Sequence, residues 1–382
     1  MNDHFATAMG RALEQTRAGN PAEAMRLIQA VLNGPETAMS VSDSDTAQPA
    51  PRPRRPLGQV IDSLVKGKAM HGLGLGLGLG LEKARFDQPL SIPDGASYER
   101  HRHACAFGER DVRVFLPSPR GEPARGLILM LHGCTQSADD FAAGTRMNLA
   151  AEEHNLIIAY PEQTRRANQM GCWNWFRGED QRRRGGEAAL LADLASSLAS
   201  QHGVPDDRIF AAGLSAGGAM AAILGDTHPE VFAAVGVHSG LAPGSATDVA
   251  SAYAAMQGHG AAHRAERSFA VRSIVFHGSA DTTVAKSNGD AVVAAALGGL
   301  AADQIEDGSV AGAAVVMHRD RAGTTLVEQW TLPGVGHAWS GGSPEGSYTH
   351  PSGPDASAEM VRFFLSVPED RNKSPASPAS RT

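Results

Sequence analysis

The hexapeptide Gly213-Leu214-Ser215-Ala216-Gly217-Gly218 decides the fold of this chain because of the segments that surround it. An apolar run at residues 208–212 precedes it, and a helix-forming run at residues 219–222 follows it. This order predicts a strand, a sharp turn and a helix, with Ser215 in the turn and its hydroxyl exposed. A Gly-Ser-Gly string arises easily by chance in a chain with 43 glycines. The predicted strand and helix on either side nevertheless favour a nucleophilic serine.

Short apolar runs alternate with helical patterns on both sides of this turn. A hairpin is predicted first, with strands at residues 98–107 and 110–116. The other predicted strands are residues 126–131, 156–160, 208–212, 232–237, 273–276 and 326–332, and the predicted helices lie near 138–154, 187–201, 285–297 and 355–365. Alternation of this kind predicts an α/β fold with a mostly parallel central sheet flanked by helices.

Four segments are expected along the chain. Residues 1–34 carry two helical patterns separated by a Gly-Asn-Pro turn and predict a helical N-terminal hairpin. Residues 35–96 contain an Arg/Pro cluster and a Gly-Leu repeat and predict a flexible linker. Residues 97–367 are expected to form the catalytic domain, and residues 368–382, which are rich in Pro and Ser, a disordered tail.

The composition narrows the classes of function. A formal net charge of −7 over 382 residues argues against nucleic acid as the main partner. Three cysteines, without zinc-type spacing, predict neither a disulfide scaffold nor a metal site, and no cofactor is expected. No apolar run reaches 18 residues and no signal peptide is visible, which predicts a cytoplasmic protein without a transmembrane segment. The oligomeric state is left open.

A serine hydroxyl needs a base held by an acid, in the chain order serine, acid, histidine. Asp281 follows the strand predicted at residues 273–276, and His337 lies in a glycine-rich loop after the strand at residues 326–332. We therefore predict Ser215 as nucleophile, Asp281 as acid and His337 as base. The chain has 15 histidines, and other candidates for the base, such as His277, are interpreted as structural partners. The other candidate for the acid, Asp290, falls within a predicted helix.

Catalysis also requires hydrogen-bond donors for the oxyanion that develops on the substrate. The strand at residues 126–131 ends in His132-Gly133-Cys134, a sequence typical of the loop that donates to this oxygen. The backbone amides of Cys134 and Ala216 are the two predicted donors.

Four blocks occur in order: Leu131-His132-Gly133-Cys134-Thr135-Gln136, Cys172-Trp173-Asn174-Trp175-Phe176, Gly213-Leu214-Ser215-Ala216-Gly217 and Gly336-His337-Ala338-Trp339-Ser340-Gly341-Gly342. Together they resemble the esterase family that includes poly(3-hydroxybutyrate) depolymerases and feruloyl-type esterases. The resemblance covers about residues 98–365. It implies an α/β-hydrolase fold, a Ser-His-Asp triad and hydrolysis of carboxylic esters. It also makes an extracellular location the alternative to a cytoplasmic one.

The substrate is expected to be an ester, either oligomeric or polymeric 3-hydroxybutyrate or, as the alternative, a feruloyl or acetyl ester from plants. Trp173, Trp175, Trp339 and His238 fall at the predicted rim of the site and are the candidate substrate-binding residues, although a tryptophan here also fits a core position. A different hypothesis makes the chain a binding protein for polyester granules with secondary esterase activity. Residues 1–90 would then attach it.

Cys134 and Cys172 follow two strands that are predicted to be neighbours, so a disulfide between them is predicted. Resemblance to largely secreted esterases favours this bond, whereas a reducing cytosol would leave two buried thiols.

Overall fold

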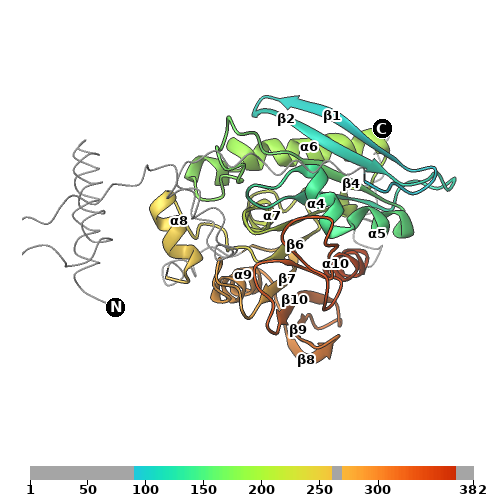
Figure 1. Cartoon of the computed structure of the whole chain (residues 1–382). Coiled ribbons are helices and arrows are strands. Elements are labelled where there is room, and N and C mark those ends of the chain that lie inside the picture. The colour runs from blue at the N-terminus through green and yellow to red at the C-terminus, as the bar shows by residue number, and fades with distance from the viewer. Residues whose placement is uncertain (1–89, 260–268, 367–382) are drawn as a thin grey trace, which may run out of the picture. The chain divides into compact units, whose positions relative to one another are not determined.

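The computed structural model describes residues 90–259 and 269–366 (Figure 1). The predicted N-terminal hairpin at residues 1–34, nearly all of the linker at 35–96 and the tail at 368–382 lie outside these ranges.

One large sheet organises the described part of the chain. Its ten strands run in the order β1-β2-β4-β3-β5-β6-β7-β10-β9-β8. The bounds are β1 Ser97–Cys105, β2 Gly108–Leu116, β3 Gly126–Leu131, β4 Leu156–Pro161, β5 Ile209–Leu214, β6 Ala234–His238, β7 Arg272–Gly278, β8 Gln304–Val310, β9 Ala313–Arg319 and β10 Thr325–Leu332. From β4 to β10 every neighbouring pair is parallel, while β1, β2, β8 and β9 pair antiparallel at the two edges.

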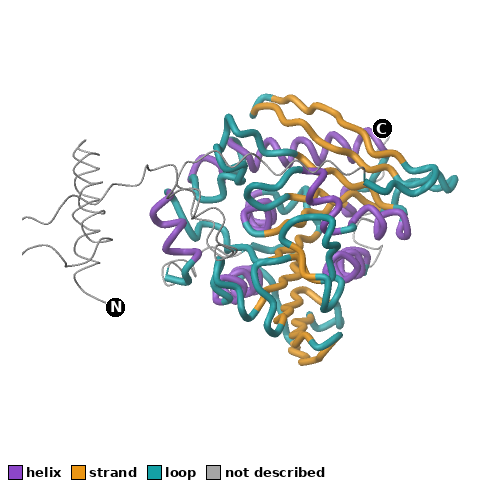
Figure 2. Tube along the Cα trace, viewed as in Figure 1, coloured by secondary structure: helices purple, strands orange, loops and turns teal. Residues whose placement is uncertain are grey.

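Helices cover both faces of this sheet, as Figure 2 shows. On one face pack α6 (Gly186–His202), α7 (Ala216–Thr227) and α9 (Ser287–Leu297), and on the other α4 (Ala138–Thr145), α5 (Met147–His154) and α10 (Ala356–Leu365). Successive residues of β3 divide between the two cores, because side chains alternate across a strand. This explains why the central strands are apolar without interruption. The predicted α/β architecture is confirmed.

Some elements differ from the sequence prediction. The single helix expected at residues 138–154 is divided into α4 and α5 at Arg146, whose left-handed backbone (φ 53°) ends α4. The Arg146 guanidinium donates to the Gly341 carbonyl at 2.7 Å, so the break joins these helices to a later loop. Helix α8 (Val249–Met256) was not predicted, nor were β8 and β9. Strand β8 is exposed along its whole length and lacks the alternating pattern that would reveal it.

The carboxyl ends of the central strands carry the predicted site. Cys134 follows β3, Ser215 follows β5, Asp281 follows β7 and His337 follows β10. Short elements also follow these strands: the 3-10 helix Gly178–Gln181 comes after β4, and the paired strands β11 (Trp339–Ser340) and β12 (Thr349–His350) come after β10. A second 3-10 helix, Asp206–Arg208, lies at the amino end of β5. Within the described ranges, every helix is too short or too polar to cross a membrane.

Candidate active site

The backbone at Ser215 has a conformation that side chains other than glycine rarely adopt. Its φ is 58° and its ψ −118°, in the turn between β5 and α7. The flanking glycines have no alternative: a Cβ on Gly213 would lie 2.6 Å from the carbonyl oxygen of Leu131, and one on Gly217 would overlap that same oxygen. The turn is fixed further by the Ser215 amide, which donates to the His238 carbonyl at 2.9 Å. Ser215 is thereby held partly exposed at the end of the sheet.

The loop after β3 lies directly beside this serine. A Cβ built on Gly133 would lie 3.7 Å from the Cβ of Ser215, which is ordinary van der Waals distance. The amide of Gly133 donates to Gln136 Oε1 at 2.9 Å, and the amide of Thr135 donates to the Met170 carbonyl at 2.9 Å. Within the described ranges the amide of Cys134, between them, has no acceptor. It is therefore available to a substrate oxygen.

The amide of Ala216 is the second predicted donor. Ala216 is the first residue of α7, and the first amides of a helix have no acceptor within that helix. The helix dipole adds partial positive charge at this end. Both predicted donors thus lie close to Ser215, because Cys134 follows β3, Ala216 follows β5, and these two strands are parallel neighbours.

His337 and Asp281 form a hydrogen-bonded pair. The Nδ1–H of His337 donates to Asp281 Oδ2 at 2.7 Å, and the amides of Thr283 and Val284 each donate to Oδ1 at 2.9 Å. Burial acts to raise the pKa of Asp281, but the hydrogen bond and charge of His337, with the Val284 amide, outweigh it and lower that pKa. The Asp281 carboxylate is therefore ionised and holds the His337 ring in one orientation, with Nε2 remaining for a substrate or for Ser215.

Two further histidines surround this pair and are held neutral. Burial lowers the pKa of His238 to about 3, and burial also lowers the pKa of His277. His277 Nε2–H donates to the Val284 carbonyl at 2.9 Å and lies 3.5 Å from Asp281 Oδ2. His238 Nε2 accepts from the Ser340 amide at 3.1 Å. These contacts place His238 and His277 in supporting positions. His277 Nδ1 also lacks a hydrogen-bond partner, but it is buried beside Gly289 of α9, so His337 is the candidate base.

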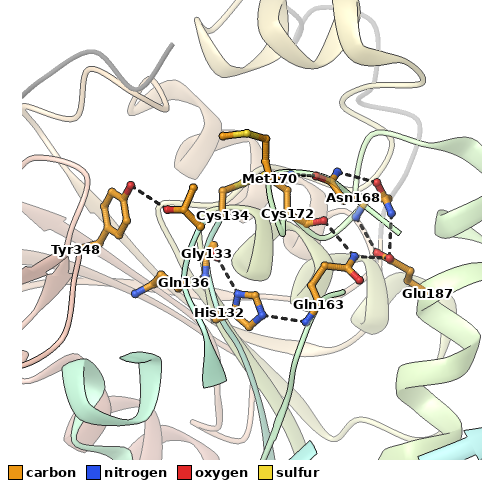
Figure 3. Close-up of a disulfide and its surroundings, with 12 residues drawn as sticks. His132, Gly133, Cys134, Gln136, Gln163, Asn168, Met170, Cys172, Glu187 and Tyr348 are labelled. Atoms are coloured by element: carbon orange, nitrogen blue, oxygen red, sulfur yellow. Dashed lines mark hydrogen bonds between the residues drawn. A yellow bond between two sulfur atoms is a disulfide. The ribbon is translucent and has the colours of Figure 1, made fainter. Parts of the chain in front are cut away.

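A disulfide joins the loop after β3 to the loop after β4. It links Cys134 to Cys172, and Figure 3 shows the two strands' loops meeting there. Strands β3 and β4 are parallel neighbours, so their carboxyl ends bring the two cysteines together. The bond restrains Cys134, whose amide is the first predicted oxyanion donor.

A buried polar network below the disulfide was not predicted from the sequence. Glu187 of α6 accepts from the Asn174 amide at 2.7 Å, pairs with Arg110 at 3.0 Å and also accepts from the Gln163 side chain. The Gln163 amide in turn donates to His132 Nε2 at 3.1 Å (Figure 3). These residues hold the loops of Cys134 and Cys172 in place. They lie far apart in the sequence, and no local pattern marks them.

The four residues that the sequence suggested for substrate binding are buried in the structure. Trp173 and Trp339 are fully buried and Trp175 is 5% exposed. The Trp339 indole donates to Ser357 Oγ at 3.1 Å, and His238, also fully buried, stacks between Trp339 and Phe276. All four side chains are therefore buried and do not line the surface of the site. The exposed side chains beside the Cys134 loop are instead Met170 and Tyr348, each about half exposed.

The chain is similar in sequence to known esterases. A profile of the family described as esterase PHB depolymerase matches residues 112–316, more than half of the chain. Poly(3-hydroxyalkanoate) depolymerase C of Paucimonas lemoignei is 29% identical over 245 residues, covering 59% of this chain and 58% of that protein. Feruloyl esterase B of Thermothelomyces thermophilus is 31% identical over 127 residues, covering 33% of this chain and 43% of that protein. The chain thus spans little more than half the length of the depolymerase.

Among solved structures, an acetyl xylan esterase from Aspergillus awamori superposes with a TM-score of 0.54 at 18% identity, over 70% of this chain and all of that one. This likeness concerns the fold, which is that of an α/β-hydrolase. With the profile match over more than half its length, the chain belongs to the PHB depolymerase family of esterases.

Proposed function

We propose that this protein hydrolyses carboxylic esters through an acyl-enzyme formed on Ser215. The observation that supports this most strongly is the meeting of three features at one sheet edge: the strained Ser215 turn, the free Cys134 amide beside it and the His337–Asp281 pair. Each supplies what ester hydrolysis requires, namely a nucleophile, an oxyanion donor and a base.

In the proposed mechanism His337 Nε2 takes the proton of the Ser215 hydroxyl as Oγ attacks the ester carbonyl. The amides of Cys134 and Ala216 donate to the oxygen that becomes negative, and Asp281 stabilises the imidazolium. His337 then returns the proton to the departing alcohol. Water, deprotonated by the same histidine, releases the acyl group and restores Ser215.

For the substrate we propose oligomeric or polymeric 3-hydroxybutyrate. Two of the relatives with the longest matched segments are polyester depolymerases, the second being poly(3-hydroxybutyrate) depolymerase of Ralstonia pickettii. The rim also supports an apolar chain: Met170 and Tyr348 are exposed beside the Cys134 loop, and the Tyr348 hydroxyl lies 3.3 Å from Thr135 Oγ1 (Figure 3). The alternative is a feruloyl or acetyl ester, since relatives with those names also match.

The disulfide supports an extracellular location over the cytoplasmic one, because such bonds persist in oxidising compartments. A location outside the cytosol would also give the protein access to a polymeric substrate there.

Activity of the purified full chain on a substrate panel tests the proposal. The panel contains hydroxybutyrate oligomers of increasing length, polymer particles, an acetylated xylan and a feruloyl ester. Hydroxybutyrate oligomers should be hydrolysed with the highest kcat/KM, and Ser215→Ala should abolish hydrolysis and labelling by a fluorophosphonate. Preference for the feruloyl or acetyl ester would replace the polyester assignment. Full activity of Ser215→Ala would overturn the mechanism itself.

A further inference from the structure

A cluster of three potential metal ligands lies well away from the candidate active site. His103 and Cys105 belong to β1, the edge strand, and Asp193 belongs to α6, which packs beside it (Figure 1). Three strands, β2, β4 and β3, separate β1 from β5 and the Ser215 turn. The proposed ester hydrolysis uses none of these three side chains.

The fold brings the three ligand atoms together in a compact group. Residues two apart on a strand point to the same face, so His103 and Cys105 both face α6. His103 Nε2 lies 2.7 Å from Asp193 Oδ1, and the nitrogen, the oxygen and the Cys105 sulfur all lie within 4.8 Å of one another. Ligand atoms around one tetrahedral zinc ion are between about 3 and 4 Å apart, as bond lengths of about 2.0 to 2.3 Å require. Only a small adjustment of side chains separates this group from a zinc site.

The surroundings also fit a bound cation of charge +2. The Phe107 amide donates to Cys105 Sγ at 3.4 Å, a contact that stabilises negative charge on sulfur and orients it. A thiolate and a carboxylate carry two negative charges, which a zinc ion neutralises. The His103 side chain is 14% exposed and that of Asp193 41%, so a water molecule has access as a fourth ligand.

We propose that His103, Cys105 and Asp193 form a zinc-binding site, with Nε2, Sγ and a carboxylate oxygen as ligands and water in the fourth position. The combination of thiolate and imidazole selects zinc over calcium or magnesium, which prefer oxygen ligands. On binding, the Cys105 thiol loses its proton to solvent, and neutral His103 carries its single proton on Nδ1 so that Nε2 is free to bind the metal. The site ties the edge strand to α6. The spacing of cysteines and histidines along the sequence did not predict such a site.

Cobalt substitution tests the site directly. The full-length protein is freed of metal with a chelator and titrated with Co²⁺, which takes zinc's place and gives a near-ultraviolet charge-transfer band when thiolate is a ligand. Cys134 and Cys172 are joined in the disulfide, so Cys105 is the thiol available for this band. We expect one Co²⁺ per chain, loss of the band when Zn²⁺ is added, and one Zn²⁺ retained in equilibrium dialysis.

Conservative variants identify the ligands. Cys105→Ser should remove the band, and Asp193→Asn and His103→Gln should each weaken Zn²⁺ binding at least tenfold. His101→Gln is the matched control, because His101 lies on the same face of β1 and its Nε2 faces Glu99 at 3.8 Å. This control should bind like the wild type. Failure of the wild-type protein to bind Zn²⁺ saturably, or a band that survives Cys105→Ser, would show that His103 and Asp193 form an ion pair only.

Discussion

The backbone of Gly217 touches the carbonyl oxygen of Leu131, with no room for a Cβ between them. Gly217 is the second residue of helix α7, which follows Ser215, and Leu131 ends the strand that leads into the Cys134 loop. This one contact therefore sets the separation between the proposed nucleophile and the proposed oxyanion donor.

Gly217→Ala should destabilise the protein severely, because the new methyl group must displace the β3 backbone. Gly225→Ala is the matched control in the same helix, where the nearest atom to a Cβ is a Val235 methyl carbon at 3.3 Å. There the gain in helix propensity, up to about 1 kcal/mol, offsets the tight contact. Thermal unfolding of both variants is the measurement. Equal melting temperatures would contradict the steric argument.

Asp281→Asn should lower kcat by about 10⁴-fold with little change in substrate binding, since the amide no longer fixes the His337 tautomer. Asp290→Asn is the control. Asp290 was the rival acid in the sequence, and the structure pairs it with Lys286 on the surface at 2.7 Å. Steady-state kinetics of the two variants decide which aspartate is the acid. A large loss of kcat in Asp290→Asn, with Asp281→Asn still active, would assign the role to Asp290.

Stability should fall as the pH drops from about 6.5 toward about 3. The pKa of His238 is lowered to about 3 in the folded protein by burial, whereas an unfolded histidine titrates near 6.5. Between these values the unfolded chain binds the extra proton, so this stabilisation is present above pH 6.5 and is lost on acidification. His238 alone contributes at most about 1.4 kcal/mol per pH unit.

His238→Gln keeps an acceptor for the Ser340 amide and removes this titration. Denaturant unfolding from pH 7 to pH 4 should therefore give a shallower dependence for His238→Gln than for the wild type. The exposed His101→Gln serves as the control and should keep the wild-type slope. An unchanged slope in His238→Gln would show that other groups account for acid destabilisation.

Removal of the disulfide should affect both stability and activity. The bond closes a loop with a sequence separation of 38, for which the chain-entropy model gives about 4 kcal/mol. The double variant Cys134→Ser/Cys172→Ser should lose stability of that order and also kcat, because the donor amide at position 134 is no longer restrained. Alkylation of the denatured, chelator-treated wild type without reductant should modify one cysteine, Cys105. Three modified cysteines would show that the bond does not form in solution.

The exposed rim should distinguish long substrates from short ones. Met170→Ala and Tyr348→Ala should raise KM for hydroxybutyrate oligomers severalfold and leave a short acetyl ester unaffected, because only a long apolar chain reaches both side chains. Ile305→Ala, at an exposed position on the distant edge strand β8, is the control for loss of apolar surface. If all three variants behave alike on oligomers, the rim has no part in substrate preference.

The sequence by itself determined the features that depend on neighbouring residues. The apolar run before Gly213 and the small residues around Ser215 specify a strand, a strained turn and a helix, and alternation of such units specifies the α/β fold. The positions of Asp281 and His337 directly after strands also follow from local pattern, because parallel strands bring their carboxyl ends to one edge. For this reason the proposed site residues could be named before their distances were known.

Tertiary structure alone decided which side chains are covered and which distant groups meet. The local sequence around Trp173 and Trp339 fits an exposed position as well as a buried one. Their burial depends on helices and loops that pack against them from elsewhere in the chain. His103 meets Asp193 across 90 residues because α6 packs on the edge strand, and Glu187 reaches Gln163 in the same way. Such contacts arise from the packing of one element on another, and that packing leaves no periodic trace in the sequence of either element.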